Sequence, residues 1–192
     1  GYARNPELVI NFYNERRKQL LDVKPNAGHI GLAELEKDFN VTVVTQNVDN
    51  LHERAGSKRV IHLHGELTKV CSSRDPYNPH YIKELKPDEY EVKLGDKAGD
   101  GTQLRPFIVW FVESVPEIET AVDYVEKADI FVIIGTSMNV YPAAGLLNYV
   151  PRDAEVYLID PKPVDVHSMR QIHVIQKGAS EGVQELRSLL KP

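Results

Sequence analysis

The 192-residue sequence contains a single cysteine, Cys71, and has no long hydrophobic run. One cysteine excludes an internal disulfide and is typical of a reducing compartment, so we expect a cytoplasmic protein. The longest apolar run, Phe107 to Val112, has the length of a strand, whereas a membrane span needs ~18 apolar residues. No signal peptide is recognisable, although the sequence does not begin with methionine. We therefore expect no membrane partner.

The sequence also lacks concentrated positive charge. Its formal net charge is −5, and no segment collects lysine and arginine in a stripe, which argues against a nucleic-acid partner. The densest basic run, Arg16-Arg17-Lys18, is interpreted as a solvated helix face. A chain of this length with 42% apolar residues is expected to bury one globular core, with room for a small insert.

Helix and strand patterns alternate along most of the chain. Asn5, Pro6 and Glu7 form a typical helix start, with a cap, a proline in the first turn and an acid near the positive end of the helix dipole. Apolar periodicity, with Ile30 directed inward, predicts helices over residues 6–21, 26–36, 51–55, 117–127, 143–149 and 181–190. Apolar runs predict strands over residues 41–45, 60–63, 107–110, 130–134, 156–159 and 173–176. This alternation predicts an α/β fold with a Rossmann-like doubly wound, mostly parallel sheet.

Residues 68–105 interrupt this alternation. Apolar periodicity fades there, and prolines and glycines punctuate a polar stretch. We expect a small inserted module over residues 68–105, and a Rossmann-like domain made of residues 22–67 and 106–192. The helix within residues 1–21 precedes both.

Polar side chains follow two of the predicted strands. Gln46, Asn47 and Asp49 come after the strand of residues 41–45, and His64 with Gly65 follows the next strand. The carboxyl ends of parallel strands bind ligands, so these groups are expected to form one site. Asparagine and aspartate are also common in ordinary turns.

A histidine in such a place can act as a base, because its unperturbed pKa of ~6.5 lets it accept a proton at neutral pH. His62 lies two residues earlier, so spacing on a regular strand does not choose between it and His64. The strand end and Gly65, which permits close approach of a ligand to the backbone, favour His64. We interpret His62 as structural.

Two further strand ends carry ligand-binding patterns. Gly135, Thr136 and Ser137 follow a wholly apolar strand, and small residues there let a phosphate or ribose approach backbone donors. Asp160 also ends a strand, where an acid often binds a ribose diol in dinucleotide-binding folds.

Four segments stand in a characteristic order along the chain: Gln46-Asn47-Val48-Asp49, His64-Gly65, Val109-Trp110-Phe111-Val112-Glu113 and Gly135-Thr136-Ser137. Together they resemble motifs of the sirtuins, the NAD-dependent protein-lysine deacylases, over nearly the whole chain. The resemblance is greatest to the bacterial class III members of the desuccinylase and demalonylase type. Sirtuins carry a glycine-rich cofactor loop upstream of the region that matches residue 1, so the chain is expected to be N-terminally truncated.

The resemblance implies a role for each matching residue. His64 is the base acting on the ribose of an ADP-ribosyl intermediate. The residues implied to contact NAD are Gln46, Asn47, Asp49, Gly135, Thr136, Ser137, Asp160 and Ala179. The residues implied to pair with the substrate peptide are Val109, Trp110, Phe111, Val112 and Glu113. Two positions depart from the family pattern, because sirtuins usually have glycine at Val112 and asparagine at Asp160.

Tyr13 and Arg16 lie three residues apart, on one face of the first predicted helix. One interpretation gives them no binding role and treats them as an exposed aromatic ring and a solvated arginine. Sirtuins that remove acidic acyl groups carry a Tyr-x-x-Arg pair in a matching helix, where a planar guanidinium and a phenol suit a carboxylate. The resemblance therefore implies that residues 1–21 contribute to an acyl pocket that accepts succinyl or malonyl groups.

A zinc site is not expected. Many sirtuins hold their small module together with four cysteines on zinc, and Cys71 stands where the first would fall. One thiolate, with His80 as the nearest histidine in the module, does not make a closed four-ligand site. We therefore predict an insert without zinc cysteines and no metal.

The resemblance implies NAD-dependent removal of acyl groups from protein lysines, acidic ones as well as acetyl, with nicotinamide and O-acyl-ADP-ribose as products. The partners would be acylated lysine-containing proteins or peptides. Two alternatives remain open from the sequence: a protein ADP-ribosyltransferase, and a non-catalytic NAD- or ADP-ribose-binding module.

Overall fold

The computed structural model describes residues 2–110, 113–135, 143–163 and 170–191 and divides into two compact units. Unit 1 consists of Gly1–Lys24, Thr45–Asn50 and His62–Pro116, and unit 2 of Pro25–Val44, Leu51–Ile61 and Glu117–Pro192. These units regroup the expected domains. The first helix and the module of residues 68–105 fall together in unit 1, with the polar segment 45–50.

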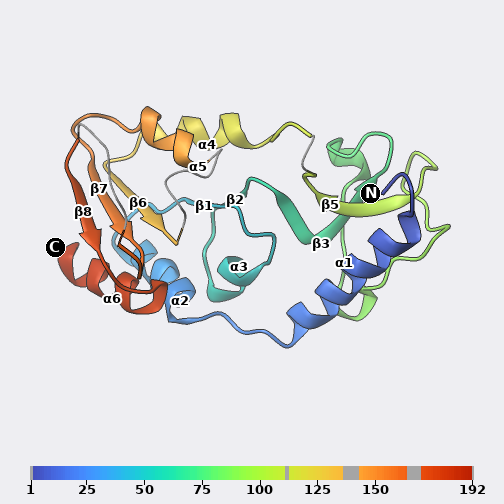
Figure 1. Ribbon diagram of the computed structural model, residues 1–192, viewed down its shortest axis with the longest axis horizontal. Coiled ribbons are helices and arrows are strands. Elements are labelled where there is room, and N and C mark those ends of the chain that lie inside the picture. Colours follow the sequence, from blue (N-terminus) through green and yellow to red (C-terminus); the bar gives the residue numbers. More distant parts are fainter. Residues whose placement is uncertain (1, 111–112, 136–142, 164–169, 192) are drawn as a thin grey trace. The chain divides into compact units, whose positions relative to one another are not determined.

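The centre of unit 2 is a parallel sheet of three strands in the order β6-β7-β8 (Figure 1). The strands are β6 (Ile130–Ile134), β7 (Glu155–Ile159) and β8 (Ile172–Ile175). Helices α2 (Ala27–Glu34) and α6 (Ala179–Leu189) lie on one side of the sheet, and α4 (Ile118–Val125) and α5 (Ala143–Leu146) on the other. Parallel strands covered by helices on both faces confirm the predicted α/β, Rossmann-like doubly wound fold.

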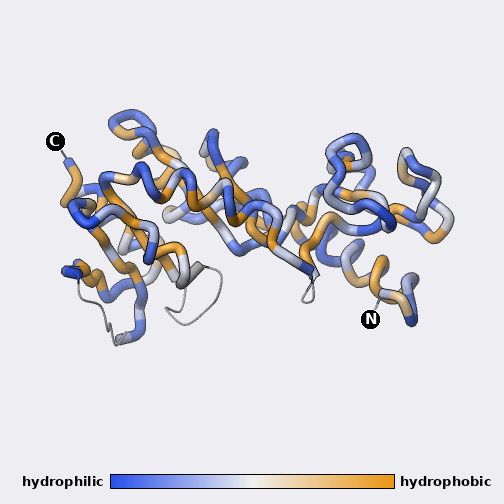
Figure 2. The backbone as a smooth tube through the Cα atoms, turned by 90° about the horizontal axis from the view of Figure 1, so that it is seen from above, coloured by the Kyte–Doolittle hydropathy of each residue, from blue (hydrophilic) through white to orange (hydrophobic). Residues whose placement is uncertain are grey.

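The apolar composition of these strands explains their burial (Figure 2). Leu158 and Ile159 of β7 are fully buried, and each such side chain contributes about 1.5–3 kcal/mol relative to exposure. Val183 of α6 packs in the same cluster. At Gly31 of α2 a Cβ atom would stand 2.7 Å from Val183 Cγ1, so the glycine lets the two helices approach closely.

Helix α2 begins at the predicted cap. Asn26 Oδ1 accepts from the His29 backbone N–H, and His29 Nδ1 accepts from the Asn26 N–H, both at 3.0 Å. The inward direction predicted for Ile30 is wrong, because its side chain is 43% exposed. The helix packs through Gly31 and the following turn instead, where Leu35 is buried.

The remaining elements that lie wholly or partly in unit 2 are short. β1 (Val43–Thr45) and β2 (Val60–His62) form a two-stranded sheet, and both end at residues of unit 1. The others are α3 (Leu51–Ala55) and the 3-10 helices Leu35–Lys37 and Leu147–Tyr149.

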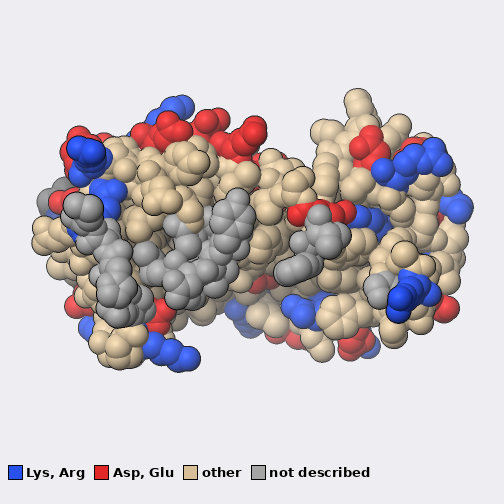
Figure 3. Space-filling model, turned by 45° about the horizontal axis from the view of Figure 1, so that its top comes forward, with Lys and Arg blue, Asp and Glu red and all other residues tan. Residues whose placement is uncertain are grey.

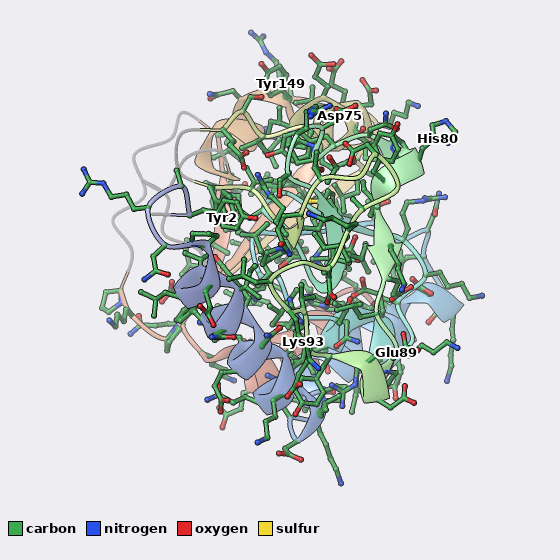
Figure 4. All side chains as sticks on the ribbon, turned by 90° about the vertical axis from the view of Figure 1, so that its right-hand side faces the viewer. Tyr2, Asp75, His80, Glu89, Lys93 and Tyr149 are labelled. Atoms are coloured by element: carbon green, nitrogen blue, oxygen red, sulfur yellow. The ribbon has the colours of Figure 1, made fainter. Side chains whose placement is uncertain are left out.

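Unit 1 combines helix α1 (Pro6–Leu21) with an antiparallel sheet of order β4-β3-β5. The Leu8 N–H donates to Asn5 Oδ1 at 3.1 Å, so the cap and both helix ends agree with the prediction. The strands are β3 (Gly65–Ser72), β4 (Lys83–Glu84) and β5 (Leu104–Ile108), and two 3-10 helices span Pro79–Tyr81 and Pro87–Glu89. Figure 4 shows α1 running beside the segment that carries Lys93.

Strand β3 is the longest element that the sequence pattern did not reveal; the short β4 and the two 3-10 helices of unit 1 were also not predicted. The burial of β3 does not alternate regularly, because Val70, Cys71 and Ser72 are all buried in succession. The register with β5 shifts between Gly65 and Val70, and such an irregularity breaks the two-residue period on which strand prediction depends.

Two general features bear on partners. Within the described ranges no helix is long and apolar enough to cross a membrane. In unit 2, exposed acidic groups gather over α4 (Figure 3), where Glu119 and Asp123 stand on the helix and Glu117 and Glu126 flank it. This face is unsuited to a polyanion such as nucleic acid.

Candidate active site

The polar turn after β1 is held by hydrogen bonds at several points. Thr45 is buried, and its Oγ1 accepts from the Asn47 backbone N–H at 3.0 Å. The Thr45 carbonyl accepts from Leu63 N at 2.9 Å, and the Val48 carbonyl from Leu67 N at 2.8 Å. The turn is therefore tied to the segment that leads from β2 into β3.

Gln46 presents an acceptor without a partner. Its Oε1 atom is fully buried and accepts no hydrogen bond from any described residue. A buried polar atom left in this state costs about 1–3 kcal/mol, so the position suits an incoming donor such as a sugar hydroxyl. Asn47 beside it is exposed and Asp49 is half-buried.

The two histidines of this region have different environments. β2 ends at His62, so His64 lies in the short turn before β3 and the regular alternation stops. The His64 carbonyl accepts from Val109 N at 2.9 Å. The half-buried His64 ring makes no hydrogen bond to the described residues, which leaves a ring nitrogen available to accept a proton.

His62, by contrast, is buried and bonded. Its Nδ1 lies 3.1 Å from the Asn47 carbonyl oxygen, and its Nε2 lies 3.8 Å from Glu66 Oε1. The geometry therefore separates two residues that sequence spacing could not, and it supports His64 as the candidate base.

Gly65 has a different purpose from the one predicted. Its φ of +90° is a conformation that favours glycine, and a Cβ atom there would collide with the Phe107 carbonyl oxygen. The close approach is therefore made by the backbone of β5, where Gly65 pairs with Ile108, and not by a ligand.

The predicted peptide-binding segment follows β5 directly. The bond from Val109 N to the His64 carbonyl links its start to the candidate base. The Trp110 ring lies 3.8 Å from the Arg105 guanidinium carbon, a cation–π contact. Phe111 and Val112 lie outside the described residues.

The Glu113 carboxylate is engaged by hydrogen bonds within unit 1. Both oxygens are engaged by Arg105, at 3.0 and 3.1 Å, and Oε1 also accepts from Tyr77 Oη at 2.8 Å and Trp110 N at 2.9 Å. Burial opposes ionisation of Glu113, but these hydrogen bonds outweigh it and lower its pKa. The Glu113 carboxylate thus stabilises the turn that carries Trp110, while the backbone pairing of this segment with a substrate peptide stays a prediction.

The Tyr13–Arg16 pair stands on α1 as the spacing predicted. Arg16 is exposed, its guanidinium carbon lies 5.8 Å from the centroid of the Phe12 ring, and it forms no ion pair with a described acid. The half-buried Tyr13 ring contacts Phe12 edge-on at 5.1 Å. The Arg16 guanidinium and the Tyr13 phenol can each donate hydrogen bonds to a carboxylate.

The neighbouring Arg17 contradicts the prediction of a solvated basic run. It is 3% exposed and donates to the Tyr90 carbonyl at 2.8 Å, the Leu67 carbonyl at 3.3 Å and Asn14 Oδ1 at 2.8 Å. Burial lowers its pKa to about 10. A groove of about 440 Å³ lies nearby, between α1 and residues 90–94, and contains none of the predicted site residues.

In unit 2, Gly135 follows β6 at the carboxyl edge of the parallel sheet. Its φ is +61°, the space around its Cα is open, and its N–H donates to the Ile159 carbonyl at 3.0 Å. A backbone position of this kind can face a ligand closely. Thr136 and Ser137 lie outside the described residues.

Asp160 and Ala179 belong to the same unit. Asp160 follows β7, and because Ile134, Ile159 and Ile175 share one register, it lies at the edge that carries Gly135. Its Oδ1 accepts from the Lys162 N–H at 2.9 Å, which leaves Oδ2 for another donor. Ala179 is exposed at the start of α6.

Cys71 is sequestered in unit 1. It is fully buried, and its Sγ lies 3.7 Å from the Pro106 carbonyl oxygen. Burial raises the pKa of the thiol to about 11, so at neutral pH it is the protonated form, which does not ligate metals. His80 is exposed on the 3-10 helix Pro79–Tyr81 (Figure 4).

We expect Cys71 of the native protein to react with iodoacetamide at pH 8 about 100-fold or more slowly than in the urea-unfolded chain, because both burial and the raised pKa suppress the thiolate. Intact-mass spectrometry over time measures both rates. Equal rates in the native and unfolded states would contradict the packing described.

Comparison with known proteins shows the family of this chain. A model of the Sir2 family matches residues 1–142. The chain belongs to the Sir2 family. It is 83% identical to a protein of Bacteroides thetaiotaomicron named NAD-dependent protein deacylase, over 100% of this chain and 82% of that protein.

Solved structures of the family have the same fold. A Sir2 homolog in complex with NAD shares 34% identity with a TM-score of 0.81, covering 99% of this chain and 75% of its own. A Sir2 complex with a p53 peptide and NAD+ shares 28% identity with a TM-score of 0.77, and the match covers 98% of this chain and 79% of that chain.

Proposed function

We propose that this chain removes acyl groups from protein lysines with NAD as cofactor, accepting succinyl and malonyl as well as acetyl groups. The observation that carries the proposal is the His64 imidazole, which makes no hydrogen bond to the described residues, while the His64 carbonyl bonds to Val109 in the segment that leads into Trp110. A close relative named NAD-dependent protein deacylase supports the reaction class.

The polar groups described fit NAD. In unit 1, the buried and unpartnered Gln46 Oε1 suits a ribose hydroxyl, and Asn47 and Asp49 would hold the nicotinamide. In unit 2, Gly135 and Asp160 occupy the carboxyl edge of the parallel sheet, where nucleotides bind in such folds. When bound, NAD supplies an anomeric carbon that the acyl oxygen can attack as nicotinamide leaves.

His64 would take the proton of a ribose hydroxyl. An unbonded, half-buried imidazole is suited to this role, because its lone pair is not engaged by a described residue. The hydroxyl oxygen would then bond to the acyl carbon, and one water would be consumed as the lysine amine leaves that carbon, so that the products would be deacylated lysine, nicotinamide and O-acyl-ADP-ribose. The substrate would be an acylated peptide, and the family member solved with a p53 peptide supports a protein substrate.

The preference for acidic acyl groups rests on α1. Arg16 has a guanidinium without a carboxylate partner among the described residues, and Tyr13 can add a phenolic donor. A charge-assisted hydrogen bond to a carboxylate contributes about 1.5–3 kcal/mol. Removing it should therefore reduce turnover of an acidic substrate more than that of a neutral one.

We expect Arg16→Met to lower kcat/KM for a succinyl-lysine peptide about 10–100-fold and to change that for the acetyl-lysine peptide little. Tyr13→Phe should act in the same direction but less, since it removes one neutral donor. Mass spectrometry of paired peptides incubated with NAD measures both rates.

Lys18→Met is the matched control, because it removes another exposed cation of the same helix. A parallel loss for both peptides in Arg16→Met would contradict the acyl-carboxylate role. A mass gain on the peptide instead of a loss would establish ADP-ribosyl transfer, and no mass change with intact NAD binding would establish a binding module.

A further inference from the structure

The turn that carries Gln46 and Asn47 receives a hydrogen bond from a side chain distant in sequence. The Asn47 N–H donates to Thr45 Oγ1 within the turn, and the Val48 carbonyl accepts from the backbone N–H of Leu67. The bond to the Asn47 carbonyl comes from His62, fifteen residues along the chain. The orientation of Gln46 and Asn47 therefore depends on a histidine that no predicted chemical step uses.

The partners of His62 settle how its ring is oriented. A carbonyl oxygen can only accept, so the ring nitrogen at 3.1 Å from it, Nδ1, carries the hydrogen. On the opposite side Nε2 faces Glu66 Oε1 at 3.8 Å, which is too long for a hydrogen bond. Lys69 Nζ holds the other Glu66 oxygen at 2.7 Å, and the His62 side chain is only 4% exposed.

We propose that His62 is a positioning residue for NAD, an inference that rests on the proposed function. Its Nδ1–H sets the backbone of the turn, and the turn sets the Gln46 amide against the ribose and Asn47 against the nicotinamide. Small displacements of groups that position a reactant lower the rate strongly. Loss of this bond should therefore act on NAD and leave the affinity for the acyl peptide unchanged.

Two substitutions of similar size separate the bond from the bulk of the ring. His62→Asn places an amide nitrogen near the position of Nδ1 and can keep the bond to the Asn47 carbonyl. His62→Gln places its amide near the position of Nε2 and loses that bond while keeping a polar group toward Glu66. Both remove the ring, so thermal melting should report a similar loss of stability for each.

We expect His62→Gln to raise the KM for NAD about tenfold, the upper range for one neutral hydrogen bond, with the KM for the peptide unchanged. His62→Asn should restore most of the NAD affinity. His80→Gln, a change at an exposed histidine of the same unit, controls for loss of imidazole. Equal KM values for NAD in the Asn and Gln variants, or a parallel rise in the peptide KM, would overturn the proposal.

Calorimetric titration with NAD distinguishes this inference from the proposed function. If the unsubstituted protein binds NAD but removes no acyl group, the proposed function fails. In that case, weaker NAD binding by His62→Gln than by His62→Asn still supports the positioning role, and equal binding overturns it.

Discussion

His64→Ala is expected to lower acyl removal about 10²–10⁴-fold, the usual contribution of a positioned general base, with NAD binding retained. The ring makes no hydrogen bond to the described residues, so its removal leaves no buried group unpaired. The bond from Val109 N to the carbonyl of residue 64 involves backbone only and persists in the variant. Initial rates with acyl peptides by mass spectrometry, beside calorimetry with NAD, measure the two quantities.

His80→Ala provides the control for this substitution, because it truncates an exposed histidine of unit 1 that belongs to no predicted site. The assignment of His64 as base fails if the alanine variant retains more than a tenth of the activity. It also fails if activity and NAD binding fall together, since that pattern indicates loss of the cofactor contact and not of proton transfer.

Arg105→Met is expected to destabilise the protein by about 3 kcal/mol, the lower end for removing one member of a buried ion pair, because the Glu113 side chain left behind is 21% exposed. Arg105 is 4% exposed, and it donates to both Glu113 oxygens and, at 2.8 Å, to the Ile108 carbonyl. Without it, the Glu113 carboxylate loses its charge partner. Urea unfolding followed by circular dichroism measures the free energy.

The double variant Arg105→Met/Glu113→Leu should recover part of that loss, because it leaves no uncompensated charge. If the double variant is less stable than Arg105→Met by the full cost of a second core substitution, the two residues do not act as a pair. Such additivity would contradict the network described.

The same pair predicts a pH dependence of stability. The pKa of Glu113 is lowered in the folded protein, so its contribution is present above its unfolded pKa of ~4.3 and is lost as the pH falls through the folded value. Arg105→Met should reduce this acid sensitivity.

A second pH dependence is expected in alkaline solution, because burial and the bond to Glu113 raise the pKa of Tyr77 to about 12. The contribution of Tyr77 to the free energy of unfolding is fully present below the unfolded tyrosine pKa of ~10 and disappears as the pH rises toward 12.

The parts predicted well from sequence depend on local signals. The cap at Asn5 and the apolar run of β6 each lie within a few residues of the element they define, and α1 and β6 have the predicted bounds. The turn at Gln46 and His64 also joins as expected, since neighbouring strands place their carboxyl ends together.

What the sequence could not reveal depends on contacts between distant segments. Arg17 reads as one of three solvated cations, yet it bonds to a carbonyl 73 residues away at Tyr90. Gly65 is likewise required by the backbone of β5, because a Cβ atom there would collide with the Phe107 carbonyl oxygen. A buried cation on carbonyl oxygens leaves no periodic pattern, because its partners are groups that every residue carries.

The burial of Arg17 has a consequence for the side chains that α1 presents on its exposed face. Its bonds to the Tyr90 and Leu67 carbonyls, both outside the helix, restrain rotation of α1 about its own axis, because turning the helix by one residue, about 100°, would pull the guanidinium from both oxygens. Tyr13 and Arg16 therefore keep a fixed orientation relative to the rest of unit 1. If Tyr13 and Arg16 bind the acyl carboxylate as proposed, acyl selectivity would change through exchange of those two side chains and not through rotation of the helix.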